Sequence, residues 1–197
     1  MRFRLFGTEF YISFLFAAVI TAMLAFDRTG FILPLFFAIL IHELGHLVAM
    51  WILDCAPKRV RLVPAAVEIT TKIGSGGKHE IIIALCGPAV NLLMFGTLFV
   101  NYLAFGNEGY LTVGLINLLI GVFNLIPVTG LDGGTVLFNL ICRKAEPSHA
   151  GLIMRIINFS VAVAALITAI ILCFKGQFNL SFFILALYLF VMSIIKI

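Results

Sequence analysis

Charged residues are scarce in this chain. Asp, Glu, Lys and Arg make up only 11% of its 197 residues, whereas soluble domains carry about 25%. Because hydrophobic residues make up 62% and the mean hydropathy is +1.18, the composition excludes an ordinary soluble domain and predicts an integral membrane protein. The sequence also lacks internal repeats, low-complexity runs and any polar segment large enough to fold alone. We therefore expect a single membrane domain over residues 1–197.

Cysteine is also sparse. The four cysteines have no metal-like spacing, so we expect neither disulfide bonds nor a cysteine metal site. The 13 basic residues are not interleaved with aromatic residues in the way that nucleic-acid binders require, which excludes nucleic acid as a partner. A net charge of +4 instead suits loops that face the anionic headgroups of a lipid bilayer.

Long apolar runs dominate what is present. A bilayer core of about 30 Å needs about 20 apolar residues per helix. Six stretches approach this length, namely 10–26, 31–53, 81–105, 111–142, 152–174 and 178–195. The fourth is longer than one crossing and contains Pro127 and Gly130, so we expect it to break and resume. The sequence thus predicts an all-α polytopic membrane protein with about six transmembrane helices.

The basic residues predict the orientation of these spans. If the N-terminus is cytoplasmic and the six spans alternate, all basic residues except Arg28 and Lys175 lie on the cytoplasmic side. Both termini are then cytoplasmic, in a multi-pass membrane protein. The loop at 54–80 alternates apolar and polar residues, which predicts short strands after the second span. An edge of these strands could receive an extended peptide.

Strongly polar residues inside an apolar stretch are the clearest functional signal. His42, Glu43 and His46 all lie within residues 31–53. Residues four apart on a helix share a face, so two neutral imidazoles can bind one Zn²⁺ while Glu43 acts on a metal-bound water. In a soluble protein the same pattern often occurs by chance on a surface helix, where water solvates the side chains. The core of a bilayer offers no such solvation. The pattern therefore predicts a zinc protease site.

Catalytic zinc usually takes three protein ligands and one water, so a third ligand is needed. Asp132 is the candidate, because it lies in the break of the fourth stretch at the predicted depth of the histidines. A buried carboxylate is costly unless it is paired, and a dication removes that cost. Gly133 and Gly134 permit close backbone approach, and Pro127 ends the preceding helix. The alternative is that Asp132 only caps a helix.

Three motifs together resemble the site-2 protease family of intramembrane zinc metalloproteases, peptidase family M50. They are His42-Glu43-x-x-His46, Asn124-x-x-Pro127 and Leu131-Asp132-Gly133-Gly134. The sequence is most similar to the stage IV sporulation protein FB branch. The likeness covers the membrane region and includes Gly87-Pro88-x-x-Asn91, a pattern similar to one found in this family.

This resemblance implies a zinc bound by His42, His46 and Asp132, with Glu43 as the general base. It gives Asn124 a role in holding the backbone of a membrane-tethered protein substrate, which is cleaved near the cytoplasmic interface. In the sporulation branch the substrate is a sigma-factor precursor, the location is the mother-cell membrane around the forespore, and membrane proteins inhibit the enzyme.

Several alternatives stay open. The substrate could be another membrane-tethered regulator, such as an anti-sigma factor. Many members of the branch carry a nucleotide-sensing CBS domain after the membrane core, but the sequence to Ile197 predicts none. A membrane metal transporter could also place His, Glu and Asp in its spans, although a transport path would spread them over membrane depth. An inactive relative that acts as a scaffold is the third class.

Five further positions have structural explanations. We expect Gly87, Asn91 and Asn117 to serve helix packing rather than catalysis, because small and amide side chains promote helix association in membranes. His79 and His149 are expected to be solvated loop residues rather than metal ligands.

Overall fold

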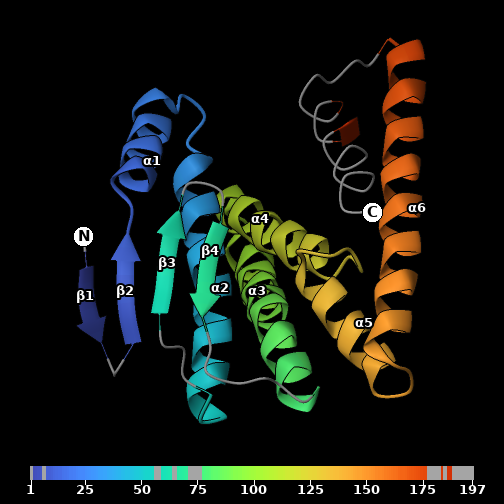
Figure 1. Cartoon of the computed structure of the whole chain (residues 1–197). Coiled ribbons are helices and arrows are strands. Elements are labelled where there is room, and N and C mark those ends of the chain that lie inside the picture. Colours follow the sequence, from blue (N-terminus) through green and yellow to red (C-terminus); the bar gives the residue numbers. More distant parts are fainter. Residues whose placement is uncertain are drawn as a thin grey trace. The chain divides into compact units, whose positions relative to one another are not determined.

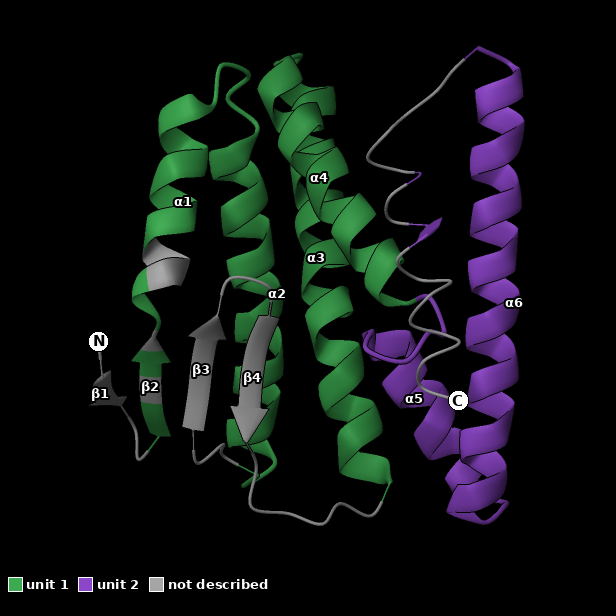
Figure 2. Ribbon diagram, turned by 45° about the horizontal axis from the view of Figure 1, so that its top comes forward, with its two compact units in different colours: residues 1–125 green, residues 126–197 purple. Residues whose placement is uncertain are grey.

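A computed structural model describes residues 2–5, 8–55, 59–63, 66–70, 77–176, 183, 186 and 187. These residues include four strands and six helices (Figure 1). In chain order the elements are β1 (Arg2–Leu5), β2 (Thr8–Ile12), α1 (Phe14–Phe26), α2 (Ile32–Ile52), β3 (Arg59–Val63), β4 (Ala66–Thr70), α3 (Lys78–Phe105), α4 (Glu108–Asn124), α5 (Asp132–Cys142) and α6 (Pro147–Phe174). The chain divides into two compact units, Met1–Leu125 and Ile126–Ile197 (Figure 2).

Three helices in the described part of the chain are long and apolar enough to cross a membrane. They are α2 with 21 residues, and α3 and α6 with 28 residues each. Helix α4 is a shorter apolar helix of 17 residues. The predicted multi-pass helical class is confirmed, but the described residues supply three full-length spans rather than six. Most of the sixth predicted stretch, 178–195, lies outside the described residues.

The first predicted span, 10–26, is wrong at its start. Residues Thr8–Ile12 form β2, and α1 begins only at Phe14. The 13 residues of α1 reach about 20 Å, which is less than a bilayer core of about 30 Å. Strand β2 is rich in β-branched and aromatic residues, which favour strands, and it is paired on both sides. Pairing with a distant strand is a tertiary contact that the hydropathy of this stretch did not reveal.

The predicted strand-forming loop is confirmed as the hairpin of β3 and β4, but the sheet is larger than predicted. Its order is β1-β2-β3-β4, so the N-terminal hairpin extends it. Strands β2 and β3 run parallel, with Glu9 opposite Arg59 and Ile12 opposite Leu62. The connection between two parallel strands must cross over, and here α1 and α2 provide it. The all-α prediction therefore needs this four-stranded sheet as a correction.

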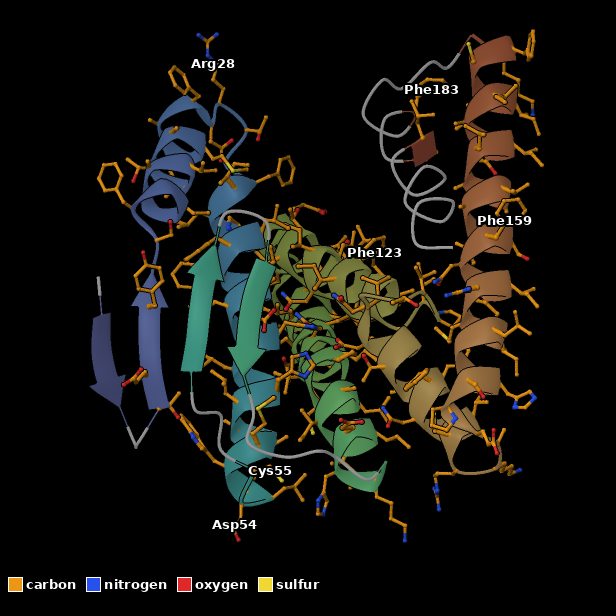
Figure 3. All side chains as sticks on the ribbon, viewed as in Figure 1. Arg28, Asp54, Cys55, Phe123, Phe159 and Phe183 are labelled. Atoms are coloured by element: carbon orange, nitrogen blue, oxygen red, sulfur yellow. The ribbon has the colours of Figure 1, made fainter. Side chains whose placement is uncertain are left out.

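Helices α1 and α2 contact each other inside this crossover (Figure 1). Arg28 lies at the turn between them, and Asp54 and Cys55 lie at the opposite end of α2 (Figure 3). The crossover therefore carries the chain along the full length of α2 before it returns to the sheet.

Small residues bring α2, α3 and α4 close together in the first unit. A Cβ added to Gly45 would lie 2.8 Å from the Cys86 carbonyl oxygen, and one added to Gly121 would lie 3.3 Å from the Pro88 carbonyl oxygen. Large apolar side chains point outward instead, and Leu93 is 69% exposed. Small residues between helices and large residues outside form the arrangement that a bilayer favours.

The second unit contains α5 and α6, which contact each other. The chain leaves helical structure after Asn124 and resumes at Asp132, so the fourth apolar stretch breaks and resumes as predicted. Pro147 at the start of α6 suits the first turn of a helix, where the missing N–H has no intrahelical partner. Ala150 and Met154 of α6 are buried.

Candidate metal centre

The two histidines of the predicted zinc motif lie together on one face of α2. His42 and His46 are one helical turn apart, and both are buried, with 4% and 7% of their surface exposed. Their Nε2 atoms are 3.2 Å apart, and their rings are inclined at 85° to one another. The expectation that the two side chains face one point is confirmed.

Helix α3 orients both imidazole rings through their other nitrogen. His46 Nδ1 lies 2.8 Å from the carbonyl oxygen of Ile83, and His42 Nδ1 lies 2.7 Å from Asn91 Oδ1. Because these oxygens only accept hydrogen bonds, each Nδ1 carries the proton and donates it. Each Nε2 therefore presents a lone pair. Neither Nε2 atom then has a proton to donate, so their contact is not a hydrogen bond. Instead, two acceptor atoms point toward the same place.

Two converging acceptors fit a metal ion. Lone pairs at this separation repel each other unless a cation lies between them. Two nitrogens bound to one tetrahedral zinc at 2.0–2.1 Å lie about 3.3 Å apart, close to the 3.2 Å between the Nε2 atoms here. Gly87 leaves room for the two rings themselves, because a Cβ there would overlap the ring of His46 and lie 2.9 Å from His42 Cε1. Donor type and spacing both fit zinc.

Asp132 is the first residue of α5 in the second unit, and it is half-buried. Its carboxylate is of the type that completes a zinc site together with two histidines. A carboxylate in the first turn of a helix is also favoured by the helix dipole. The N-cap of α5 is Leu131, so Asp132 lies in the first turn of the helix rather than at the cap position that the alternative gave it.

The segment before Asp132 is held by a tight turn and by α6. A Cβ on the buried Gly134 would overlap the carbonyl group of Val128, so this position requires glycine. Thr129 donates its backbone N–H to Asn158 Oδ1 at 3.0 Å, and Asn158 Nδ2 donates to Thr129 Oγ1 at 2.8 Å. Asn158 belongs to none of the motifs in the sequence, and its only signal is an amide inside an apolar stretch.

Pro127 and Gly133 occupy the positions that the sequence analysis gave them. Pro127 lies in the break between the two helices, after α4 has ended at Asn124. Gly133 is buried in the first turn of α5. Helix α4 therefore ends before the proline, as its missing N–H and the steric limit on its neighbour require.

Glu43 follows His42 on α2 and is half-buried. Asn124, the last residue of α4, is half-buried and donates its Nδ2 to the carbonyl oxygen of Ile120 at 3.0 Å. The catalytic role of Glu43 and the substrate role of Asn124 stay predictions. His79 and His149 are exposed, as expected, but they lie in the first turns of α3 and α6 rather than in loops.

Asn91 does more than pack helices. It is fully buried, as the packing interpretation requires, but its Oδ1 also contacts the ring of His42. The sequence signal was present, since an amide in the middle of an apolar helix must find a partner. The identity of that partner depends on how α2 and α3 pack, which the sequence pattern did not reveal.

Comparisons with known sequences agree with one another. A model of the family described as Peptidase family M50 matches residues 107–167. The chain is 30% identical over 147 residues to the "Zinc metalloprotease MJ0392" of Methanocaldococcus jannaschii, an alignment that covers 69% of this chain and 43% of that protein. It is 27% identical over 174 residues to the protein sll0528 of Synechocystis, covering 76% of this chain and 46% of that protein. The chain spans less than half the length of these two relatives.

A solved structure has a similar fold. The site-2 protease from Methanocaldococcus jannaschii superposes with a TM-score of 0.67 at 24% sequence identity, and the match covers 98% of this chain and 93% of that one. At this level of identity the likeness shows the fold, which extends over nearly the whole of both chains.

Proposed function

Because the chain belongs to peptidase family M50, the site-2 protease family of intramembrane zinc metalloproteases, we propose that it is itself an intramembrane zinc endopeptidase. The observation that carries this proposal is the pair of buried histidines whose Nε2 atoms converge at 3.2 Å. A transporter is less well supported, since the two histidines lie one helical turn apart rather than along a path through the membrane.

The chain's own residues supply the remaining chemistry. His42, His46 and Asp132 would hold the zinc, which when bound acts as a Lewis acid toward the scissile carbonyl group and the attacking water. Glu43 would accept the proton of that water and deliver it to the leaving nitrogen. Asn124 would donate a hydrogen bond to the extended substrate backbone. Co²⁺ or Mn²⁺ could replace zinc in vitro, since the ligands do not exclude them.

The substrate must present an extended peptide bond. A helical substrate keeps its peptide groups in its own hydrogen bonds, so cleavage requires local unwinding. Strand β4 is the last in the order of the described sheet, and its pairing there is with β3 alone. An extended segment could add to such an edge through main-chain hydrogen bonds. A membrane-tethered protein whose transmembrane helix unwinds near the cytoplasmic interface would present such an extended segment.

We propose a membrane-tethered regulator as the substrate. The three motifs resemble the sporulation branch, which favours the sigma-factor precursor as the first substrate to test; an anti-sigma factor is the alternative. The cellular location would then be a bacterial cell membrane, with both termini cytoplasmic, and the mother-cell membrane around the forespore for the sporulation substrate. The basic residues support this orientation, since alternating spans place all of them except Arg28 and Lys175 on the cytoplasmic side. Membrane-protein inhibitors would restrain the enzyme.

The test is co-expression of the chain with a tagged sigma-factor precursor or a tagged anti-sigma factor. Wild type is compared with Glu43→Gln, and Glu108→Gln serves as the control because Glu108 is an exposed acid at the start of α4. We expect Glu43→Gln to retain zinc and to cleave at least about 100-fold more slowly, as the loss of a general base predicts. If wild type binds zinc but cleaves neither reporter, the substrate class is wrong. If wild type binds no zinc, the protease proposal is wrong.

A further inference from the structure

Asn91 of α3 and Asn117 of α4 are among the largest fully buried side chains of the described residues. They are 0% and 1% exposed, although both lie in apolar helices. Burial of an amide without hydrogen bonds is energetically unfavourable. Both amides therefore need hydrogen-bond partners inside the protein.

A continuous chain of hydrogen bonds joins these two amides to His42. Asn117 Nδ2 donates to the carbonyl oxygen of Val113 at 2.9 Å, and Asn117 Oδ1 accepts from Asn91 Nδ2 at 2.9 Å. Asn91 Nδ2 also donates to the carbonyl oxygen of Ala38 at 3.1 Å. Asn91 Oδ1 in turn accepts from His42 Nδ1 at 2.7 Å. These hydrogen bonds thus connect α4, α3 and α2, and they end on the imidazole ring of His42, a residue of the metal-binding motif.

The two backbone carbonyl groups determine the direction of every bond in this chain. A carbonyl oxygen cannot donate, so the amide nitrogen of Asn117 must face Val113, and that of Asn91 must face Ala38. The Asn91 oxygen is then the atom that faces His42. It accepts only from the tautomer of His42 that carries its proton on Nδ1. In that tautomer Nε2 is unprotonated and available to a metal.

We propose that Asn91 and Asn117 are positioning residues that hold His42 in its metal-binding tautomer and orientation. Asn91 acts on the ring directly, and Asn117 acts by fixing the orientation of the Asn91 amide. His46 differs, because its Nδ1 partner is a backbone carbonyl group, which a side-chain substitution does not remove. The inference rests on the proposed metal site, and its measurable consequence is metal affinity.

The experiment titrates purified full-length protein in detergent with Co²⁺, followed by visible absorption, and then displaces the Co²⁺ with Zn²⁺. The variants are Asn91→Leu, Asn91→Asp and Asn117→Leu. Asn101→Leu is the matched control, because Asn101 is also an asparagine of α3 but donates to Thr97 of its own helix at 2.8 Å. Thermal unfolding of each metal-free protein is measured in parallel.

We expect Asn91→Leu to weaken Co²⁺ binding about 10–100-fold, the usual effect of removing a partner that orients a ligand. Asn91→Asp keeps an acceptor for the Nδ1 proton but loses the donor to Ala38 and Asn117, so it should restore only part of the affinity and bind more tightly than Asn91→Leu. Asn117→Leu should weaken binding by a smaller factor than Asn91→Leu, and Asn101→Leu should not change it. The Co²⁺ absorption of Asn91→Leu should also differ in shape, because the ring of His42 loses its fixed orientation.

Unchanged affinity in a folded Asn91→Leu protein would overturn the inference, and so would a loss that Asn91→Asp fails to restore even in part. An equal loss in Asn101→Leu would overturn it as well, because the effect would then be common to any amide of α3. If Asn91→Leu does not fold, Asn117→Leu carries the test, and wild-type affinity there contradicts the chain of hydrogen bonds. Wild type that binds neither metal would remove the proposed function together with this inference, whereas the other outcomes leave that function intact.

Discussion

Gly87 of α3 lies so close to His46 of α2 that a single carbon added at position 87 would overlap the Nε2 and Cε1 atoms of the imidazole ring. The absence of a side chain at this position leaves room for the ring of His46, whose Nε2 atom converges on that of His42. Gly87 therefore serves the metal centre as well as the packing of α2 against α3, which was the role that the sequence analysis expected.

Gly87→Ala should weaken metal binding at least about 10-fold, because the methyl group would push the ring of His46 out of its orientation. Co²⁺ titration of the purified protein measures this effect. Gly96→Ala is the control, since Gly96 lies on the same helix and a Cβ there meets nothing within 4 Å. It should bind metal like wild type and gain up to about 1 kcal/mol of stability from helix propensity. Wild-type affinity in Gly87→Ala would contradict the close contact.

Gly134→Ala should disrupt the turn before α5, because its Cβ would overlap the backbone of Val128, which cannot move aside as a flexible side chain can. We expect cleavage to fall by about 10–100-fold, since a shift of about 1 Å in a reacting group has an effect of this size. Gly151→Ala on α6, where a Cβ meets nothing within 4 Å, is the control and should be as active as wild type. An active Gly134→Ala enzyme would show that the turn adapts freely.

Asn158→Leu should lower cleavage of the reporter by a similar factor, about 10-fold or more, because it removes both hydrogen bonds that fix Thr129 in the segment before Asp132. Ser160→Ala removes a hydroxyl group of the same helix that donates only to its own backbone, at Ile156, and should leave cleavage unchanged. The rate of single-turnover cleavage at saturating zinc is the measurement. Equal rates in the two variants would remove any special role for Asn158.

Removal of the metal should abolish cleavage without unfolding the protein. Hydrogen bonds from both histidines to α3 do not involve the ion, so the packing of α2 against α3 should persist without it. Dialysis against a chelator should therefore give an inactive protein with unchanged helix content by circular dichroism, and added Zn²⁺ should restore activity. Loss of helix content on chelation would mean that the ion organises the helices.

Asp27 predicts a pH dependence at the turn between α1 and α2. Its carboxylate accepts hydrogen bonds from the Thr29 hydroxyl group at 2.7 Å and from the backbone N–H groups of Thr29, Gly30 and Ile32 at 2.9, 3.0 and 2.9 Å. The Thr29 hydroxyl group first, and then the Ile32 N–H, hold the pKa of Asp27 below its ordinary value of 3.8. A lowered pKa stabilises the folded state above the unfolded value, and this contribution is lost as the pH falls through the folded value.

The melting temperature of wild type should therefore fall more steeply than that of Asp27→Asn as the pH is lowered from about 5 to about 2. Thermal unfolding in detergent at a series of pH values measures the difference. Asp54→Asn is the control, because it keeps Asp27 and places asparagine at a positive φ of 53°, which asparagine tolerates. It should follow the wild-type curve. Parallel curves for wild type and Asp27→Asn would rule out this contribution.

The sequence was sufficient for those parts of the protein that depend on local pattern. The spacing of His42 and His46 places them on one helical face whatever the rest of the chain does, and Pro127 ends a helix by its own chemistry. The break before Asp132 and the strands after α2 are local in the same sense. These predictions agree with the structure for that reason.

What the sequence did not reveal depends on contacts between distant residues. Strand β2 pairs with β3, which follows about fifty residues later in the sequence, and Glu9 lies opposite Arg59. Asn91 was interpreted as a packing residue because its spacing from His42 in the sequence carries no sign that Oδ1 reaches the ring. Gly87 is a similar case, since only the packing of α3 on α2 shows which atoms a side chain would meet.

The parallel pairing of β2 with β3 has a consequence for how the chain passes through the bilayer. Hydrogen-bonded neighbours in one sheet lie on the same side of a membrane, so the segment between Ile12 and Arg59 must leave and return to that side. The number of passages in it is therefore even. Since α2 is long enough for one passage, the short α1 together with its flanking residues must complete another. The sheet thus sets the parity of the crossings independently of the positions of the charged residues.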